Sequence, residues 1–170
     1  KKKKEKINFC LIGEPTNPNK LGEMIKIGRR GSLTGKLKIH GVQGHVAYPH
    51  RANNPSTTII KILKELKDLK FDKGTKDFQR TNLEVTRINI DNNADNVIPE
   101  TAESTFNIRF NNRHSSNSIK KRLNKIFKRI SKKNKSNYTI KYRVSGEAFL
   151  TKPNNTTFMI QNIIKKITRS

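Results

Sequence analysis

Hydrophobic and polar residues alternate along four stretches of the chain, a spacing typical of β-strands with one buried face. The four stretches begin near Leu33, Leu83, Ala102 and Tyr138. In the second stretch the apolar phase changes between Val85 and Ile88. This change predicts a β-bulge, because one extra residue reverses the faces of a strand.

Apolar residues three or four positions apart indicate helices in three other segments. The first begins at Pro55 and Ser56 and ends before Gly74, and the second is capped by Ser115 or Ser116. The third covers about residues 156–167. The apolar stripes of the first two helices are Ile59, Ile62 or Leu63, Leu66 and Leu69, and Ile119, Leu123, Ile126 and Ile130.

Between residues 31 and 145 these elements follow the order strand, helix, strand, strand, helix, strand. This is the order of the ferredoxin-like split βαβ fold, an α+β architecture with a four-stranded antiparallel sheet and two helices on one face. The other face of such a sheet is covered only by polar side chains and solvent. We therefore predict one ferredoxin-like domain over residues 31–145.

The segments on either side do not belong to this domain. Residues 7–12 form a nearly continuous apolar run, which predicts a strand buried on both faces of an α/β sheet. We assign residues 1–30 and 146–170 to parts of a second, α/β domain, into which the ferredoxin-like domain is inserted.

The composition raises two further possibilities. The 170-residue chain has a formal net charge of +24 and is only 32% hydrophobic, so disorder and nucleic-acid binding both need to be considered. The lysines are spread over the polar positions of apolar patterns, as at Lys36 and Lys38, and do not form one block. Richness in Lys, Asn and Ile is also typical of A/T-rich genomes, which load a surface with lysine without a binding role.

Cysteine usage and hydropathy suggest a location. Cys10 is the only cysteine, which excludes an internal disulfide and predicts a reducing, cytoplasmic environment. Its place in an apolar run predicts a buried side chain. No apolar run approaches the roughly 20 residues of a membrane-spanning helix, so we expect no membrane partner.

Three side chains could carry chemistry. Glu14 follows the predicted buried strand, where open α/β sheets place ligands, and could bind a metal or be a solvated turn residue. His45 lies in a glycine-rich loop and could donate a hydrogen bond to an oxyanion or be a plain surface histidine. Arg109, on the polar face of a strand, could bind a substrate carboxylate or simply face solvent.

Together the motifs are more specific than any one of them. They occur in the order GEPT, IKIGRRGSLTGKLKIHGVQGHVAYPHRANNP, NADNVIPE, FNIRF and RVSGEAFLTKP. In this order they closely resemble the zinc-dependent amidohydrolase and exopeptidase family, which includes acetylornithine deacetylase and the glutamate carboxypeptidases. The resemblance covers residues 10–153, and within the family it is greatest to the desuccinylases.

The resemblance implies an α/β catalytic domain with two zinc ions, for which cobalt is an alternative, and an inserted lid that forms a homodimer. Glu14 matches a terminal zinc ligand, and His45 matches a histidine that stabilises the tetrahedral intermediate in the partner subunit's active site. The positions that match substrate contacts are Arg29, Ser32, Asn96 and Arg109. Asp95 departs from the desuccinylase pattern, which has Asn-Asn here, and a carboxylate would repel an anionic substrate.

Other parts of the family's site have no match in the chain. None of the four histidines is followed two residues later by Asp, and no Glu-Glu pair occurs, so the general base and most zinc ligands are missing. We expect the chain to be the central part of a longer amide hydrolase for a small N-succinyl amino acid, without activity of its own. A related N-acyl amino acid deacylase is the nearest alternative.

A nucleic-acid-binding ferredoxin-like module is the alternative from another class. Such modules stack bases on aromatic side chains of the sheet. Neither residues 33–40 nor residues 85–90 contain these aromatics, so we do not expect nucleic acid as the partner.

Overall fold

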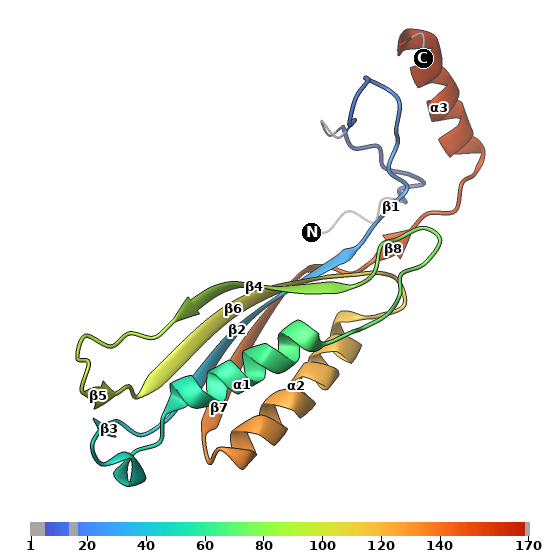
Figure 1. Cartoon of the computed structure of the whole chain (residues 1–170). Coiled ribbons are helices and arrows are strands. Elements are labelled where there is room, and N and C mark those ends of the chain that lie inside the picture. The colour runs from blue at the N-terminus through green and yellow to red at the C-terminus, as the bar shows by residue number, and fades with distance from the viewer. Residues whose placement is uncertain (1–5, 14–16, 169–170) are drawn as a thin grey trace. The chain divides into compact units, whose positions relative to one another are not determined.

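The computed structural model describes residues 6–13 and 17–168, which divide into two compact units. The sheet unit is Gly28–Leu150, and the flanking unit consists of the described residues on either side of it. The labels of helices and strands below are those of Figure 1.

The sheet unit is built on four antiparallel strands in the order β4-β6-β2-β7. They are β2 (Gly31–His40), β4 (Asn82–Asn89), β6 (Thr101–Phe110) and β7 (Asn137–Gly146). Helices α1 (Pro55–Asp68) and α2 (Ser116–Lys133) cover one face of this sheet (Figure 1). The predicted ferredoxin-like α+β fold is therefore confirmed, and so is the bulge, since the pairing of β4 with β6 shifts between Val85 and Arg87.

Two short strand pairs extend the sheet unit. At one end, β1 (Gly28–Arg29) pairs with β8 (Phe149–Leu150), and we call this end the base. At the other end, β3 (Gly44–His45) pairs with β5 (Val97–Ile98), next to the 3₁₀-helix η1 (Pro49–Arg51). We call residues 41–53 and 91–100 the tip.

Two phenylalanines of β6 fill space that two glycines of β2 leave open. Gly31 lies opposite Phe110, and Gly35 lies opposite Phe106. A methyl group on either glycine would overlap the ring of its partner, so each ring lies across the backbone of the neighbouring strand. Both rings are fully buried. The core around them also contains Leu33, Leu37, Ile39, Ile59, Ile62, Leu66, Ile108, Ile119, Leu123 and Phe127.

The helices begin at hydrogen-bonded caps. Asn54 precedes α1, and its side chain accepts the Ser56 N–H at 2.9 Å. Ser115 caps α2 and forms a reciprocal capping box with Ser118, which confirms one of the two predicted caps. Each cap satisfies backbone donors that have no partner inside the helix.

The flanking unit departs from expectation at its N-terminal side. Residues 7–12 are not a strand, and their side chains are exposed, with Ile7 at 77% and Ile12 at 73%. Cys10 is also exposed, and the prediction that it is buried was wrong. A buried strand needs a hydrogen-bonded neighbour, and in the described part of the chain no strand pairs with this segment. Helix α3 (Asn155–Thr168), by contrast, forms where predicted.

One buried carboxylate links the loops at the end of α1 and the start of α2. The Asp72 side chain is 5% exposed. It accepts hydrogen bonds from the Gly74 N–H at 2.6 Å and Asn111 Nδ2 at 2.7 Å, and His114 Nε2 lies 2.9 Å away. Burial raises the pKa of Asp72, but hydrogen bonds from Thr81, Gly74 and Asn111 outweigh it and lower the pKa from 3.8 to about 2.

This network predicts acid sensitivity. Because the folded-state pKa of Asp72 is depressed, its contribution to stability is complete above the unfolded pKa of 3.8 and is lost as the pH falls towards about 2. The pKa difference corresponds to about 2 kcal/mol. Asp72→Asn should therefore lower the free energy of unfolding by about this amount at pH 7, measured by urea denaturation, and should flatten its dependence on pH between 2 and 5.

The exposed Asp77 provides a matched control in the same loop. Asp77→Asn removes the same charge without touching the network and should change stability by less than about 0.5 kcal/mol. Equal effects of the two substitutions would contradict a special role for Asp72.

Candidate functional site

Backbone hydrogen bonds hold the tip in place around His45. The Val46 N–H donates to the Asn96 carbonyl at 3.0 Å, so the loops that carry the two predicted site residues lie side by side. Val42 and Asn53 exchange two backbone hydrogen bonds, each of 2.9 Å. The Gly41 N–H donates to the Glu100 carbonyl at 2.8 Å, which joins the end of β2 to the start of β6.

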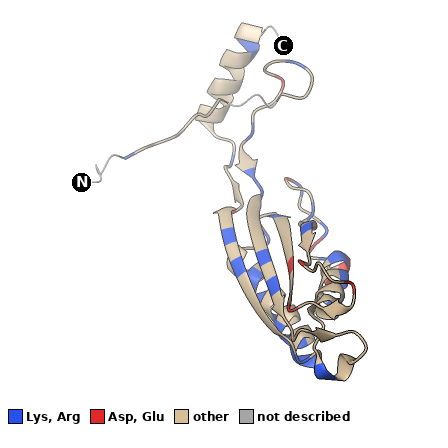
Figure 2. Cartoon of the chain, turned by 90° about the vertical axis from the view of Figure 1, so that its left-hand side faces the viewer, with Lys and Arg blue, Asp and Glu red and all other residues tan. Residues whose placement is uncertain are grey.

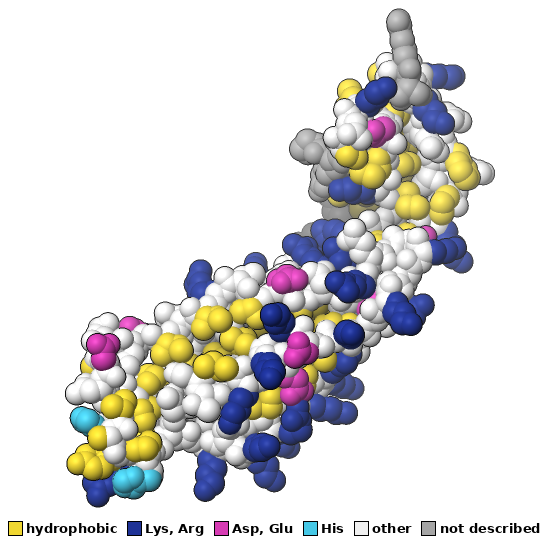
Figure 3. Space-filling view, in the orientation of Figure 1, with side chains coloured by type: hydrophobic (Ala, Val, Ile, Leu, Met, Phe, Trp, Pro, Cys, Tyr) yellow, Lys and Arg dark blue, Asp and Glu magenta, His cyan; other side chains and the backbone are white. Residues whose placement is uncertain are grey.

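The orientation of the His45 ring is set by its own loop. Its Nδ1 lies 3.1 Å from the Ala47 backbone nitrogen, and because a backbone N–H can only donate, Nδ1 must be the acceptor. In the neutral ring the proton is then on Nε2, which is left as a donor. The Tyr48 ring lies 5.9 Å from His45, and the Arg51 guanidinium lies 5.6 Å from the Tyr48 ring centroid. The tip thus presents an exposed N–H donor beside an aromatic ring, and Figure 3 shows histidine side chains on its surface.

A second group of polar residues lies at the base. Ser32 of β2 pairs directly with Arg109 of β6, and both face away from the helices. Ser32 is buried and Arg109 is exposed. The Asn107 amide donates to Thr34 Oγ1 at 2.9 Å and to Ser32 Oγ at 3.4 Å, so it orients the Ser32 hydroxyl.

The two base arginines next to β2 have different surroundings. Arg29 extends over Gly146, where its Nη2 lies 2.5 Å from the position that a Cβ atom would take. Arg30 Nη1 donates to the Arg80 carbonyl and to Asn82 Oδ1, each at 3.1 Å. Arg30 therefore fixes the start of β4, whereas Arg29 is exposed.

The predicted site residues thus form two groups. His45 and Asn96 are at the tip, with the exposed Asp95 beside them, whereas Arg29, Ser32 and Arg109 are at the base. The ten residues of β2 separate the groups, and at about 3.3 Å per residue this is roughly 30 Å. The sheet unit does not bring them together within one chain. Glu14, the predicted zinc ligand, lies outside the described residues.

Sequence patterns alone missed Asn107 and Ala47. Asn107 lies two residues before Arg109 on the same strand face, so alternation could have identified it. The role of Ala47 is carried by its backbone N–H, which leaves no signal in the choice of side chain.

The described residues contain no metal centre. In residues 6–13 and 17–168, no three His, Cys, Asp or Glu side chains are grouped so that they could hold a metal ion. None of the helices in these ranges is long and apolar enough to cross a membrane.

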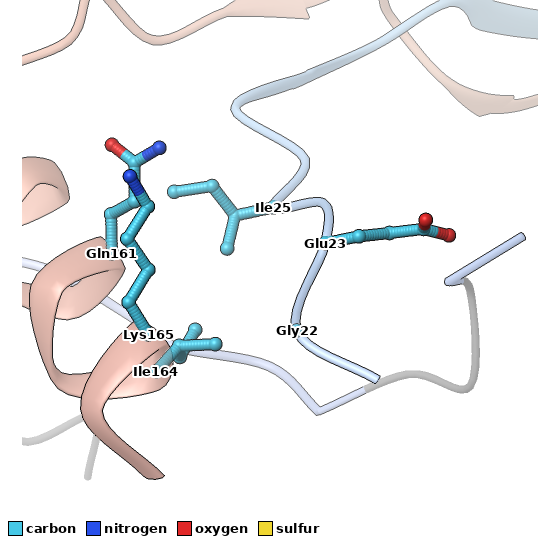
Figure 4. Close-up of a pocket in the computed structure, with 6 residues that line it drawn as sticks. All are labelled: Gly22, Glu23, Ile25, Gln161, Ile164 and Lys165. Carbon is cyan, nitrogen blue, oxygen red and sulfur yellow. The ribbon is translucent and has the colours of Figure 1, made fainter. Parts of the chain in front are cut away.

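Two pockets lie in different units. In the flanking unit, a pocket of about 230 Å³ lies between α3 and residues 22–25 (Figure 4). At the base of the sheet unit, an open depression is lined by Arg30, Lys73, Gln79, Arg80, Asn82 and Glu84. Neither pocket contains a predicted site residue.

Comparisons with known proteins agree on one family. The peptidase dimerisation domain matches residues 27–135. The succinyl-diaminopimelate desuccinylase of Pelagibacter ubique is 76% identical over 99% of this chain, which covers 44% of that enzyme. The enzyme of the same name from Rickettsia bellii is 49% identical over 94% of the chain, which covers 41% of its length. The chain therefore spans about two fifths of the length of these relatives.

Solved structures show the same fold at low sequence identity. A putative aminohydrolase from methicillin-resistant Staphylococcus aureus matches 85% of this chain, and 37% of its own, with a TM-score of 0.69 and 20% identity. Aminopeptidase PepT from Bacillus cereus matches 87% of this chain, and 38% of its own, with a TM-score of 0.69 and 12% identity.

The tip geometry predicts a strict requirement at Gly41. A methyl group on Gly41 would overlap the Asn53 carbonyl oxygen and would lie 2.6 Å from Pro55 Cδ. Gly41→Ala should therefore push the backbone at Val42 away from the backbone at Asn53. The Val42 and Val46 amides should then exchange with solvent at least about tenfold faster, measured by hydrogen exchange. Gly13→Ala is the control, because nothing lies within 4 Å of its added methyl group. Unchanged exchange at Val42 in the Gly41 variant would contradict this account of the tip.

Proposed function

This chain belongs to the peptidase dimerisation domain family, and we propose that it is the lid and dimerisation region of a succinyl-diaminopimelate desuccinylase. The complete enzyme would hydrolyse N-succinyl-LL-2,6-diaminopimelate with water to succinate and LL-2,6-diaminopimelate. Close similarity to desuccinylases over nearly the whole chain supports this substrate over those of other N-acyl amino acid deacylases. The single cysteine supports a reducing, cytoplasmic location.

The observation that carries the proposal is the separation of tip and base. A substrate that touches both His45 and Arg109 must span the length of β2 or lie between two chains. A small molecule is too short to span β2, so it would have to lie between two chains. We infer a homodimer in which the tip of one protomer meets the base of its partner.

In this arrangement, Arg109 and Arg29 bind the carboxylates of the substrate. Ser32, held by Asn107, and Asn96 provide neutral hydrogen bonds to its polar groups. His45 of the other protomer donates its Nε2 hydrogen to the oxyanion of the tetrahedral intermediate, a bond that is strongest when the negative charge has developed.

Two zinc ions in the complete enzyme would supply the nucleophilic hydroxide. The described residues do not fit such a centre, since they offer no group of three ligands. On our proposal, residues 1–30 and 146–170 return to the α/β domain that holds the metal.

The edge strand β4 and the neighbouring face of α1 are the surface that we propose for self-association. Ile88 on β4 is 58% exposed, and Ile60 on α1 is 63% exposed. Figure 3 shows hydrophobic side chains gathered over β4 and α1. An exposed apolar edge strand is a template for pairing. Antiparallel pairing of β4 with its copy would put each tip level with the partner's base, because the two strands then run in opposite directions.

The nucleic-acid alternative has less support. Residues of β2, β4, β6 and β7 that face away from the helices include no Phe, Tyr or Trp, so this face offers no stacking platform for bases.

Dimerisation can be tested on the 170-residue chain. At tens of micromolar, light scattering should give twice the chain mass of 19.6 kDa. Ile88→Lys should give the monomer mass, since a buried lysine at the pairing edge would be left without a partner. Val144→Lys changes an exposed apolar residue on β7, the opposite edge strand, and should leave the dimer intact. A wild-type monomer, or dissociation by both variants, would contradict pairing through β4.

The role of His45 across the dimer can be tested in a chimera. This chain replaces the matching segment of the Pelagibacter ubique desuccinylase, which supplies the remaining residues. His45→Ala should lower turnover by about 10²-fold to 10³-fold, the usual loss for one oxyanion donor. Zinc content should not change, because His45 is not a metal ligand in this proposal.

Mixing two defective chimeras tests whether the site is shared. His45→Ala subunits combined with Arg109→Met subunits form mixed dimers in which one site has both an intact tip and an intact base. Random exchange should restore roughly a quarter of wild-type activity. If mixed dimers form without any recovery, the shared site is ruled out. An inactive wild-type chimera would count against the function itself.

A further inference from the structure

A row of three cations crosses the sheet on the face opposite α1 and α2, which we call the outer face. Thr105 of β6 lies opposite Arg87 of β4 on one side and Lys36 of β2 on the other. Lys36 in turn lies opposite Lys141 of β7. We call these residues the cationic row, and Figure 2 shows Lys and Arg positions, in blue, along the strands of the sheet.

The charges in the neighbouring rows determine the sign of the net charge on the outer face. Towards the base, the next two rows add Arg143 and Arg109, with Glu84 as the one carboxylate in these three rows. Towards the tip, Lys38 and Glu103 form an ion pair of 2.9 Å, so that row is neutral. The three rows therefore hold five cations against one carboxylate, and the excess lies beside Arg109.

This arrangement costs stability by itself. Like charges directly opposite each other on neighbouring strands repel, because their Cβ atoms lie about 5 Å apart. Lys36 and Lys141 are such a pair, and neither forms an ion pair with any other described residue. An anion bound between them would remove the repulsion and gain attraction from both.

We propose that the cationic row binds small dicarboxylates and thereby gathers the anionic substrate beside Arg109. A small anion fits this face better than a nucleic acid, because the face has cations but no aromatic side chain. The binding is a property of the sheet unit alone. Its kinetic consequence, a higher rate of productive encounter, rests on the function proposed above.

The binding is tested by titrating the 170-residue chain with succinate at constant ionic strength, followed by backbone amide chemical shifts. The largest shifts should be at Lys36, Thr105 and Lys141, and they should saturate. Lys36→Gln with Lys141→Gln should weaken succinate binding by roughly fivefold or more, as expected for two lost charge contacts of about 0.5 kcal/mol each.

A control on the other side of the sheet unit distinguishes an effect of these two lysines from an effect of the net charge of the chain. Lys121 and Lys125 are exposed on α2, in the layer that covers the opposite face. Lys121→Gln with Lys125→Gln removes the same two charges and should leave succinate binding within about 1.5-fold of wild type. Equal weakening by both double variants, or shifts spread evenly over α2, would overturn the proposal.

The kinetic consequence is tested in the active chimera by measuring kcat/KM against ionic strength. At low salt the variant with Lys36→Gln and Lys141→Gln, the sheet-face variant, should lose at least about threefold in kcat/KM. Its dependence on salt should also flatten, because salt screens the electrostatic attraction that steers the substrate. The α2 double variant should follow wild type. An unchanged kcat/KM in the sheet-face variant would overturn the steering role. An inactive chimera would instead count against the proposed function, and the titration would still decide the binding.

Discussion

The sheet unit depends on the fit of two phenylalanine rings onto two glycines of the neighbouring strand. Phe106 and Phe110 occupy the space over Gly35 and Gly31, and no other register of β2 against β6 would provide it. A shift by one residue would move the rings to the opposite face. This fit aligns Ser32 with Arg109 and Lys36 with Thr105, so the packing of the core determines the chemistry of the outer face.

Alternation of polar and apolar residues predicted the fold because each strand of the four-stranded sheet has one face on the core and one in solvent. The same rule located the bulge, since Val85 and Ile88 both face the helices although their spacing in sequence is odd. The rule failed at residues 7–12. A continuous apolar run predicts a buried strand only if a neighbouring strand is present to pair with it, and the described residues provide none.

The candidate site was less predictable than the fold. Motifs indicated which residues to consider, but no local pattern indicates that His45 lies beyond one end of β2 and Arg109 beside the other end. That separation follows from the antiparallel order of β2 and β6, which a single motif does not contain. The hydrogen bond that orients the His45 ring was also hidden, because its donor is the backbone of Ala47.

The two edges of the sheet differ in a way that limits assembly. The β4 edge exposes Ile88 and is interrupted by the bulge, whereas the β7 edge carries Lys141 and Arg143 on its outer face. Pairing of β4 with β7 of another copy would leave a free edge at each end and could continue without limit into a filament. Charge on β7 opposes that contact. When β4 pairs with β4 of another copy, neither chain keeps a free β4 edge, so assembly stops at two chains. The difference between the two edges therefore favours a closed dimer over a fibre.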